Sequence, residues 1–232
     1  MITSTRSPTG ETVLIAAIAD GAGSAERAEV GAQAACSLFT ASVLAYLAEG
    51  GAVAGITQEA VEEWLGAIAT TLEQHAYSDE RSLRDYACTF LAAILGETHA
   101  AFVQVGDGAI VRDGPEGYRL VFWPQTGEFA NSTVFLTDPE ARNQMEFSLE
   151  QSPVSEVALL TDGLQPLALT YATRAAHVPF FQPLFLRLRQ EAEGESEVLR
   201  SQLVEWLESP RLNERTNDDK TLILATRHSV SC

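Results

Sequence analysis

The fold is decided at residues 13–21, which read VLIAAIADG. Seven apolar residues in a row, stopped by Asp20 and Gly21, have the length of a buried strand that ends in a turn. An aspartate at that point projects from the rigid end of a sheet. The glycine lets the backbone turn and lets its own carbonyl approach an ion. The stretch therefore predicts a core strand with ion-binding groups at its end.

The same arrangement returns at residues 156–163, EVALLTDG, where a second apolar run stops at Asp162 and Gly163. Asp218 precedes the last predicted strand, so we expect its carboxylate at the same sheet edge. Three carboxylates in one place repel each other unless divalent cations neutralise them, and all-oxygen ligation suits Mg²⁺ or Mn²⁺. A single Asp-Gly pair, however, is a common turn dipeptide and by itself indicates only a turn.

Other segments of the chain repeat their apolar residues at different spacings, which predict helices and further strands. Residues 25–47, after a capping Ser24, and a second segment that opens at Thr57 repeat apolar residues at helical spacing. The order of strand, two helices, a run of strands, helices and a final strand predicts an α+β fold with antiparallel sheet. Further strands are expected at 86–95, 99–105, 109–112, 118–122, 134–136, 145–149 and 221–226, helices at 164–173, 184–193 and 195–208, and loops at 127–132, 177–183 and 211–219.

Composition narrows the class of protein. The 232 residues suit one domain, 1–232. A net charge of −17 argues against a nucleic-acid partner and an anionic membrane surface, because both need clusters of Lys and Arg. Three scattered cysteines, Cys36, Cys88 and Cys232, argue against a disulfide framework or a zinc site. Since the polar N-terminus also lacks the apolar centre of a signal peptide, we expect a cytoplasmic protein.

Four short motifs follow one another along the chain, each beside the end of a predicted strand. They are ADGAGSA at 19–25, QVGDGA at 104–109, LTDGL at 160–164 and NDDKT at 217–221. In this order they resemble the protein phosphatase 2C (PPM) family, and its bacterial branch in particular, over about residues 13–227. FWP at 122–124 and NERT at 213–216 add to the likeness. The resemblance implies a four-layer α-β-β-α sandwich of two antiparallel sheets flanked by helices.

The resemblance also implies an activity, the hydrolysis of phosphoserine and phosphothreonine in proteins by a metal-activated water. Carried over by motif, Asp20 bridges two metal ions, the Gly21 carbonyl binds one of them, and Asp162 and Asp218 complete the first metal. In bacterial relatives the aspartate of the Val-Gly-Asp turn helps to bind a third ion, which here gives Asp107 that role together with Asp162. The implied cofactors are two Mn²⁺ or Mg²⁺ ions, or three. The implied partners are a phosphorylated protein and a cognate protein kinase.

The beginning of the chain departs from the family pattern. Family members open with a strand and a short acidic motif, which in the bacterial branch reads like Pro-Cys-Gln-Asp and in many members follows a phosphate-binding arginine. Only 12 residues precede the strand at 13–19, and Arg6 is the sole basic residue among them. We therefore expect the family's first strand and one outer acidic ligand of the second metal to be missing, with Arg6 in a mobile terminus.

These features leave alternatives open. A chain without the first acidic motif could be a pseudophosphatase, which keeps the fold as a binding or regulatory module, or a phosphatase for small phosphomonoesters. In the last motif the usual Asp-Asn pair is Asp218-Asp219, so Asp219 is the alternative to Asp218 as the ligand. Trp123, in a loop near a strand end, is a candidate for a binding surface as well as for packing.

Overall fold

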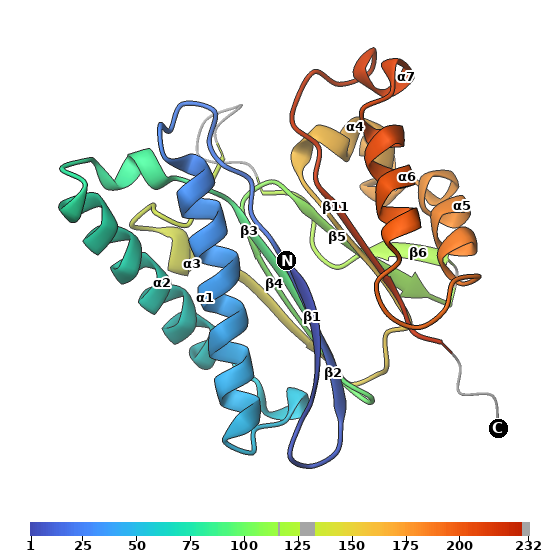
Figure 1. Cartoon of the computed structure of the whole chain (residues 1–232), viewed down its shortest axis with the longest axis horizontal. Helices are drawn as coiled ribbons and strands as arrows, with labels where there is room; N and C mark the ends of the chain where they lie inside the picture. The colour runs from blue at the N-terminus through green and yellow to red at the C-terminus, as the bar shows by residue number, and fades with distance from the viewer. Residues whose placement is uncertain (116, 126–132, 229–232) are drawn as a thin grey trace.

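The computed structural model describes residues 1–115, 117–125 and 133–228, and it contains two antiparallel sheets packed between layers of helices (Figure 1). The strands of the first sheet are β1 Ile2–Arg6, β2 Thr12–Ile18, β3 Phe90–Leu95, β4 Ala100–Val105 and β7 Glu146–Glu150, in the order β1-β2-β3-β4-β7. Those of the second are β5 Ala109–Gly114, β6 Gly117–Leu120, β8 Glu156–Leu160 and β11 Leu222–Thr226, in the order β11-β8-β5-β6. The expected α-β-β-α sandwich is confirmed.

Two long helices, α1 Ala28–Ala48 and α2 Gln58–Ser78, cover the outer face of the first sheet (Figure 1). Phe39 of α1 packs against Phe90 of β3, with 4.9 Å between ring centroids, and Leu72 of α2 is fully buried in the same core. By length and composition alone α1 is apolar enough to cross a membrane. Its contacts with β2 and β3 instead make it the core helix of this layer.

Shorter helices cover the second sheet. Phe185 of α5 Val178–Leu188 stacks on Tyr118 of β6 at 5.0 Å, and α6 Glu197–Leu207 packs beside it. A separate apolar cluster that includes Phe102 and Leu159 fills the space between the two sheets. The remaining short elements are α3 Ala141–Gln144, α4 Gln165–Ala168, α7 Pro210–Asn213 and the hairpin of β9 Leu169–Thr170 with β10 Ala175–Ala176.

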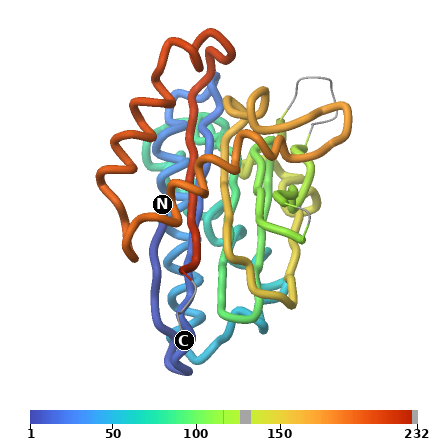
Figure 2. The backbone as a smooth tube through the Cα atoms, turned by 90° about the vertical axis from the view of Figure 1, so that its right-hand side faces the viewer, coloured from blue at the N-terminus to red at the C-terminus, as the bar shows by residue number. Residues whose placement is uncertain are grey.

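Strand register gathers the predicted site at one end of the sandwich. In the first sheet Ile18, Leu91 and Gln104 are cross-strand neighbours, so the end of β2 and the end of β4 lie at the same edge. In the second sheet Ala109, Leu160 and Leu222 are neighbours in the same way. The connections after β2, β4 and β8 and the loop before β11 all lie at the upper end in both views (Figure 1, Figure 2).

A strand precedes β2, where the sequence predicted none. β1 pairs antiparallel with β2 along its whole length and so covers an edge that would otherwise be exposed. Ile2, Thr3 and Thr5 favour an extended backbone, but the segment is too polar to stand out as a core strand. Arg6 is the last residue of this strand rather than part of a mobile terminus, and its Nε donates to the Gly10 carbonyl at 3.0 Å.

Two predictions were wrong, the strand at residues 134–136 and the loop at residues 177–183, which contains prolines. Residues 134–136 are not a strand, although the Leu136 amide donates to the Cys88 carbonyl at 2.7 Å. The loop expected at 177–183 is the start of α5, because Pro179 lies in the first turn of that helix, where its missing N–H is not needed. The loop expected at 127–132 lies outside the described residues.

Two predicted helices also differ in extent. α1 begins at Ala28, so Ser24 is not its N-cap. The helix expected over 164–173 ends at Ala168, where the β9–β10 hairpin takes over. By contrast, α2 begins as predicted, since the Thr57 hydroxyl accepts from the Ala60 amide at 3.3 Å.

Candidate metal centre

Asp20 and Asp162 come together at this end of the sandwich, although 142 positions of sequence separate them. Each follows a buried strand, β2 or β8, and the Asp162 carboxylate lies close enough to that of Asp20 to shift its pKa. Burial, followed by this contact and the charges of Asp162, Asp218 and Asp107, raises the pKa of Asp20 from 3.8 to about 7. The pair therefore favours either a proton or a cation between its oxygens.

The backbone of Gly21 lies next to Asp20, at the same end of the sandwich. The segment after β2 continues alongside residues 87–89, with Gly21 opposite Cys88 in an isolated antiparallel bridge. The two hydrogen bonds of this bridge are made by the flanking residues, from the Ala22 amide to Ala87 and from the Thr89 amide to Asp20. Gly21 is thus in a pair that is not hydrogen-bonded, and its own carbonyl points away from the neighbouring segment and can meet an ion.

Asp107 lies in the tight turn between β4 and β5. Gly106, at φ +101°, makes the turn possible, and a side chain there would strike Thr89. The Asp107 carboxylate accepts a hydrogen bond from the Thr133 hydroxyl, and its carbonyl accepts one from the Gln165 side chain. Burial and the charge of Asp162 raise the pKa of Asp107, while the bond from Thr133 acts in the opposite direction.

Asp218 lies in the exposed loop before β11. Its charge contributes to the raised pKa of both Asp20 and Asp107. The Asp219 amide donates to Asp218 Oδ1 at 2.9 Å, which orients the Asp218 carboxylate. Of the two adjacent aspartates, Asp218 is therefore the one in electrostatic contact with the cluster.

The donor set fits a hard divalent cation. Oδ1 of Asp162 is buried and has no hydrogen-bond partner within the described part of the chain, which is unusual for a carboxylate oxygen. The charged neighbours that shift the Asp20 pKa are all carboxylates, so no protein cation offsets them. Carboxylate and carbonyl oxygens are the ligands that Mg²⁺ and Mn²⁺ prefer.

The four aspartates do not form a closed cage. Within residues 1–115, 117–125 and 133–228, no three acidic, histidine or cysteine side chains stand close enough together to hold one ion. The arrangement is a contacting pair, Asp20 and Asp162, with Asp107 and Asp218 beside it. Like charges keep such carboxylates apart unless a cation draws them together.

The segment before β2 supplies no further carboxylate to the cluster. Its one acidic residue, Glu11, lies in the β1–β2 turn, where its Oε1 accepts from the Glu97 amide at 2.8 Å. That turn is at the opposite end of β2 from Asp20, as is Arg6. Neither the expected outer ligand nor a phosphate-binding arginine comes from this part of the chain.

Three residues that the sequence did not single out support the cluster. Thr133 and Gln165 hold Asp107, and the Tyr171 hydroxyl donates to Gln165 Oε1. Burial and the charges of Asp162 and Asp107 raise the pKa of Tyr171, so its phenol lies near both. A glutamine inside the otherwise apolar segment 163–169 was the sequence signal that could have drawn attention to Gln165.

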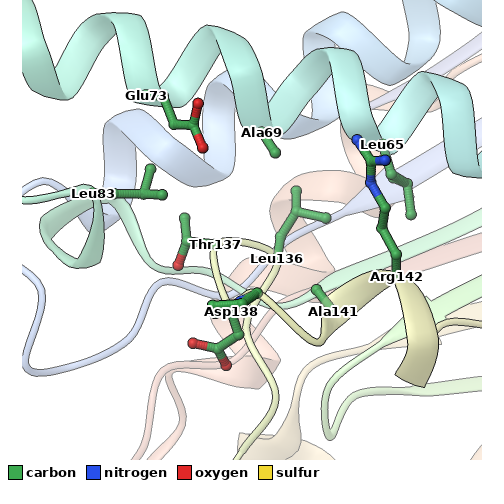
Figure 3. A pocket seen from close by; sticks show the side chains of 10 residues that line it. Leu65, Ala69, Glu73, Leu83, Leu136, Thr137, Asp138, Ala141 and Arg142 are labelled. Atoms are coloured by element: carbon green, nitrogen blue, oxygen red, sulfur yellow. The ribbon is translucent and has the colours of Figure 1, made fainter.

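Two hollows lie near this region. An open groove of about 730 Å³ is lined by Trp123, Gln125, Glu146, Tyr171 and Arg174, among others. A smaller cavity of about 250 Å³ lies between α2 and residues 136–142, with the Arg142 guanidinium at its edge (Figure 3). None of the four aspartates lines this smaller cavity, so it is not the metal centre.

Comparisons with known proteins agree with this geometry. A family model described as protein phosphatase 2C matches residues 4–208. Serine/threonine-protein phosphatase 3 of Escherichia coli (strain K12) is 37% identical over 210 residues, which cover 90% of this chain and 81% of that protein.

Solved structures show the same fold. Serine/threonine phosphatase Stp1 from Staphylococcus aureus superposes with a TM-score of 0.60 at 17% identity, over 99% of this chain and 89% of that one. The catalytic domain of the serine/threonine protein phosphatase PstP, solved with two manganese ions, gives a TM-score of 0.58 at 13% identity, over 99% and 91%.

Proposed function

The chain belongs to the protein phosphatase 2C family, and we propose that it hydrolyses phosphoserine and phosphothreonine in proteins at the Asp20–Asp162 end of the sandwich. Family membership makes it a metal-dependent serine/threonine protein phosphatase. The observation that carries the location is the contact between the Asp20 and Asp162 carboxylates, with the Asp20 pKa raised to about 7. A phosphatase for small phosphomonoesters would use the same centre and differ only in substrate.

We propose that the cofactors are two Mn²⁺ or Mg²⁺ ions, with Asp107 and Asp162 able to hold a third. Asp20 would bridge the first two ions, the Gly21 carbonyl would hold one of them, and Asp162 and Asp218 would complete the first site. The oxygen-only donor set supports a hard cation, and the two manganese ions of the PstP catalytic domain support the number. Bound there, such ions would lower the pKa of a coordinated water and neutralise the phosphoryl oxygens.

The side chains of this chain would prepare the centre in two ways. Asp20 would have to be deprotonated to hold a cation, because a proton and a cation compete for the same carboxylate oxygens. Thr133 and Gln165 hold Asp107 from opposite sides, one at the carboxylate and one at the carbonyl, which fixes the direction of its remaining oxygen.

A cysteine nucleophile is not part of this proposal. Cys36 and Cys88 are buried, and burial raises the pKa of their thiols to about 11 and about 12. Neither is therefore a thiolate near neutral pH. Two free, buried thiols also support our proposal that the protein works in the cytoplasm, where thiols stay reduced.

The pseudophosphatase alternative has no observation in its favour. Asp20, Asp107, Asp162 and Asp218 are all present at one end of the sandwich, and the other three all contribute to the raised pKa of Asp20, despite the departure at the N-terminal segment. A protein phosphatase also requires a kinase that phosphorylates its substrate, so we propose a cognate protein kinase as its functional counterpart.

The test is hydrolysis of p-nitrophenyl phosphate by the chelator-stripped protein, with and without added Mn²⁺. We expect activity only with metal, and a loss of at least about a hundredfold in Asp162→Asn, because a ligand is removed. Asp113→Asn is the matched control: Asp113 lies at the other end of β5 from Asp107, and asparagine keeps an oxygen for the Ser155 and Glu156 amides. Activity that persists in Asp162→Asn or without metal would contradict the mechanism.

A further inference from the structure

We propose that the groove beside Asp107 binds the substrate peptide next to its phosphorylated residue, and that Arg174 there recognises an acidic side chain of the peptide. This inference rests on the proposed function and deepens it, because it assigns part of the substrate specificity to named residues. The groove has a volume of about 730 Å³ and is open to solvent along its length.

One wall of the groove is fastened to the turn that carries Asp107. The Gln125 amide donates to the Gly106 carbonyl at 3.2 Å, and the Gly106 amide donates back to Gln125 Oε1 at 2.7 Å. The Trp123 carbonyl accepts from Gln104 Nε2 at 3.3 Å. Trp123 and Gln125 therefore keep a constant position beside the metal centre.

The other wall comes from the β9–β10 hairpin and is tied to the same turn. The Tyr171 hydroxyl donates to Gln165 Oε1, and Gln165 Nε2 donates to the Asp107 carbonyl. The Tyr171 and Trp123 rings meet edge to face, with centroids 5.6 Å apart. Both walls are anchored at residues 106–107. A peptide whose phosphate lies at the aspartates would therefore continue into this groove.

Arg174 gives the groove its chemical preference. Its guanidinium lies 5.1 Å from the centroid of the Trp123 ring, so the stacked face is covered while the N–H edges stay available. Within the described residues it makes no ion pair or hydrogen bond through that guanidinium. A carboxylate is the group that such planar N–H donors match best.

Arg174 has a left-handed backbone, with a φ of +49°, and ends the short helical turn Tyr171–Thr173. The chain as a whole carries a net charge of −17 and repels acidic peptides. The positive charge of Arg174 therefore marks the place where an acidic side chain of the peptide can bind.

Glu146 also lines the groove. Its Oε2 accepts from Gln125 Nε2 at 3.3 Å, so its carboxylate is held on the wall that is fastened to Gly106. Arg174 is held by no such bond within the described residues, which leaves its guanidinium available to an acidic residue beside the phosphate.

The experiment compares phosphothreonine peptides in which one glutamate or one lysine occupies each neighbouring position in turn. Each kcat/KM is divided by that for p-nitrophenyl phosphate, which has no flanking residues, so that a folding or metal defect cancels. We expect glutamate to be preferred over lysine at one position by roughly fivefold, as for a partly exposed ion pair. Arg174→Ala should remove this preference, and Arg174→Glu should reverse it.

Arg200→Ala is the control, because Arg200 is 73% exposed on α6 and pairs only loosely with Glu197, at 3.6 Å. It should leave the preference unchanged. If Arg174→Ala and Arg174→Glu keep the wild-type preference, the inference is wrong, whatever their absolute rates.

Binding separates this inference from the proposed function. Fluorescence anisotropy of a labelled phosphopeptide, measured on Asp162→Asn so that it is not cleaved, should show tighter binding of the glutamate peptide and loss of that difference on adding Arg174→Ala. A wild-type protein that binds with this difference but hydrolyses nothing would contradict the proposed function alone. Equal binding of both peptides would contradict the groove assignment alone.

Discussion

The α-carbon of Gly163 lies directly against the backbone of Asp219: a methyl group on Gly163 would stand 2.1 Å from the Asp219 carbonyl oxygen and 3.3 Å from Cβ of Asp218. The contact joins the turn that carries Asp162 to the loop that carries Asp218. A backbone carbonyl cannot yield as a flexible side chain does. The absence of a side chain at residue 163 is therefore what allows the Asp218 loop to lie against the Asp162 turn.

Gly163→Ala should separate the Asp162 turn from the Asp218 loop. We expect weaker Mn²⁺ binding, a lower kcat/KM on p-nitrophenyl phosphate and a loss of about 1–3 kcal/mol of unfolding free energy from overpacking. Gly23→Ala is the control, because a methyl group there has nothing within 4 Å. Metal titration and urea unfolding of both variants check this; equal metal affinity in the two would show that the close approach at residue 163 does not matter.

The raised pKa of Asp20 predicts a pH dependence of stability in the metal-free protein. An unfolded aspartate has a pKa of about 3.9, so between about pH 4 and pH 7 the folded chain holds a proton that the unfolded chain has released. Stability should therefore fall as pH rises through this window, by an amount on the order of 1–3 kcal/mol after allowing for solvent screening.

Urea unfolding in chelator at pH 5 and pH 8 measures this fall, and Asp20→Asn should reduce it because the titrating group is gone. Since a cation competes with the same proton, Mn²⁺ affinity of the wild type should rise over the same pH range. An identical pH profile in wild type and Asp20→Asn would mean that the Asp20–Asp162 pair does not hold this proton.

Thr133→Val removes the hydroxyl that donates to the Asp107 carboxylate. Losing this bond should raise the pKa of Asp107 further and require a roughly tenfold higher Mn²⁺ concentration for half-maximal activity, as is typical of groups that orient a metal ligand. Thr71→Val provides the control, because the Thr71 hydroxyl donates only to the Ala67 carbonyl, on the exposed side of α2. If Thr133→Val and Thr71→Val need the same Mn²⁺ concentration for half-maximal activity, Asp107 is not part of the metal centre.

Arg6→Ala should change phosphatase activity less than about twofold. Arg6 pairs with Thr12 at the far end of β2, eight residues from Asp20, which at about 3.3 Å per residue is roughly 26 Å away. Steady-state kinetics with p-nitrophenyl phosphate checks this. A large rise in KM would show that Arg6 reaches the phosphate by a route that this structure does not contain.

The strands that carry the site could be predicted because their own residues favour a buried strand without help from the rest of the fold. β2 and β8 are apolar runs stopped by Asp-Gly, and the helix at Thr57 has a capping residue in sequence. β1 could not be predicted in this way, since a short polar segment becomes a strand only because β2 offers it an edge. Pro179 misled the prediction of α5 because a proline favours a helix only when it falls in the first turn.

The aspartates of the candidate site could be named from the sequence, but their contacts could not. The motifs named Asp20, Asp107, Asp162 and Asp218, and the structure brings these four to one end of the sandwich. The sequence favoured Asp218 over Asp219 as the ligand, and in the structure the charge of Asp218, not that of Asp219, contributes to the raised pKa of Asp20 and Asp107. Thr133, Gln165 and Tyr171 support the centre through tertiary hydrogen bonds that leave no pattern along the chain.

The most direct test of the central claim is the number of Mn²⁺ ions bound per chain, measured by equilibrium dialysis of stripped protein. We predict at least two ions for the wild type and for Asp113→Asn. Asp20→Asn and Asp162→Asn should each lose at least about tenfold in affinity, with smaller losses for Asp107→Asn and Asp218→Asn. If all six proteins bind Mn²⁺ equally, the aspartates at this end of the sandwich are not the metal centre.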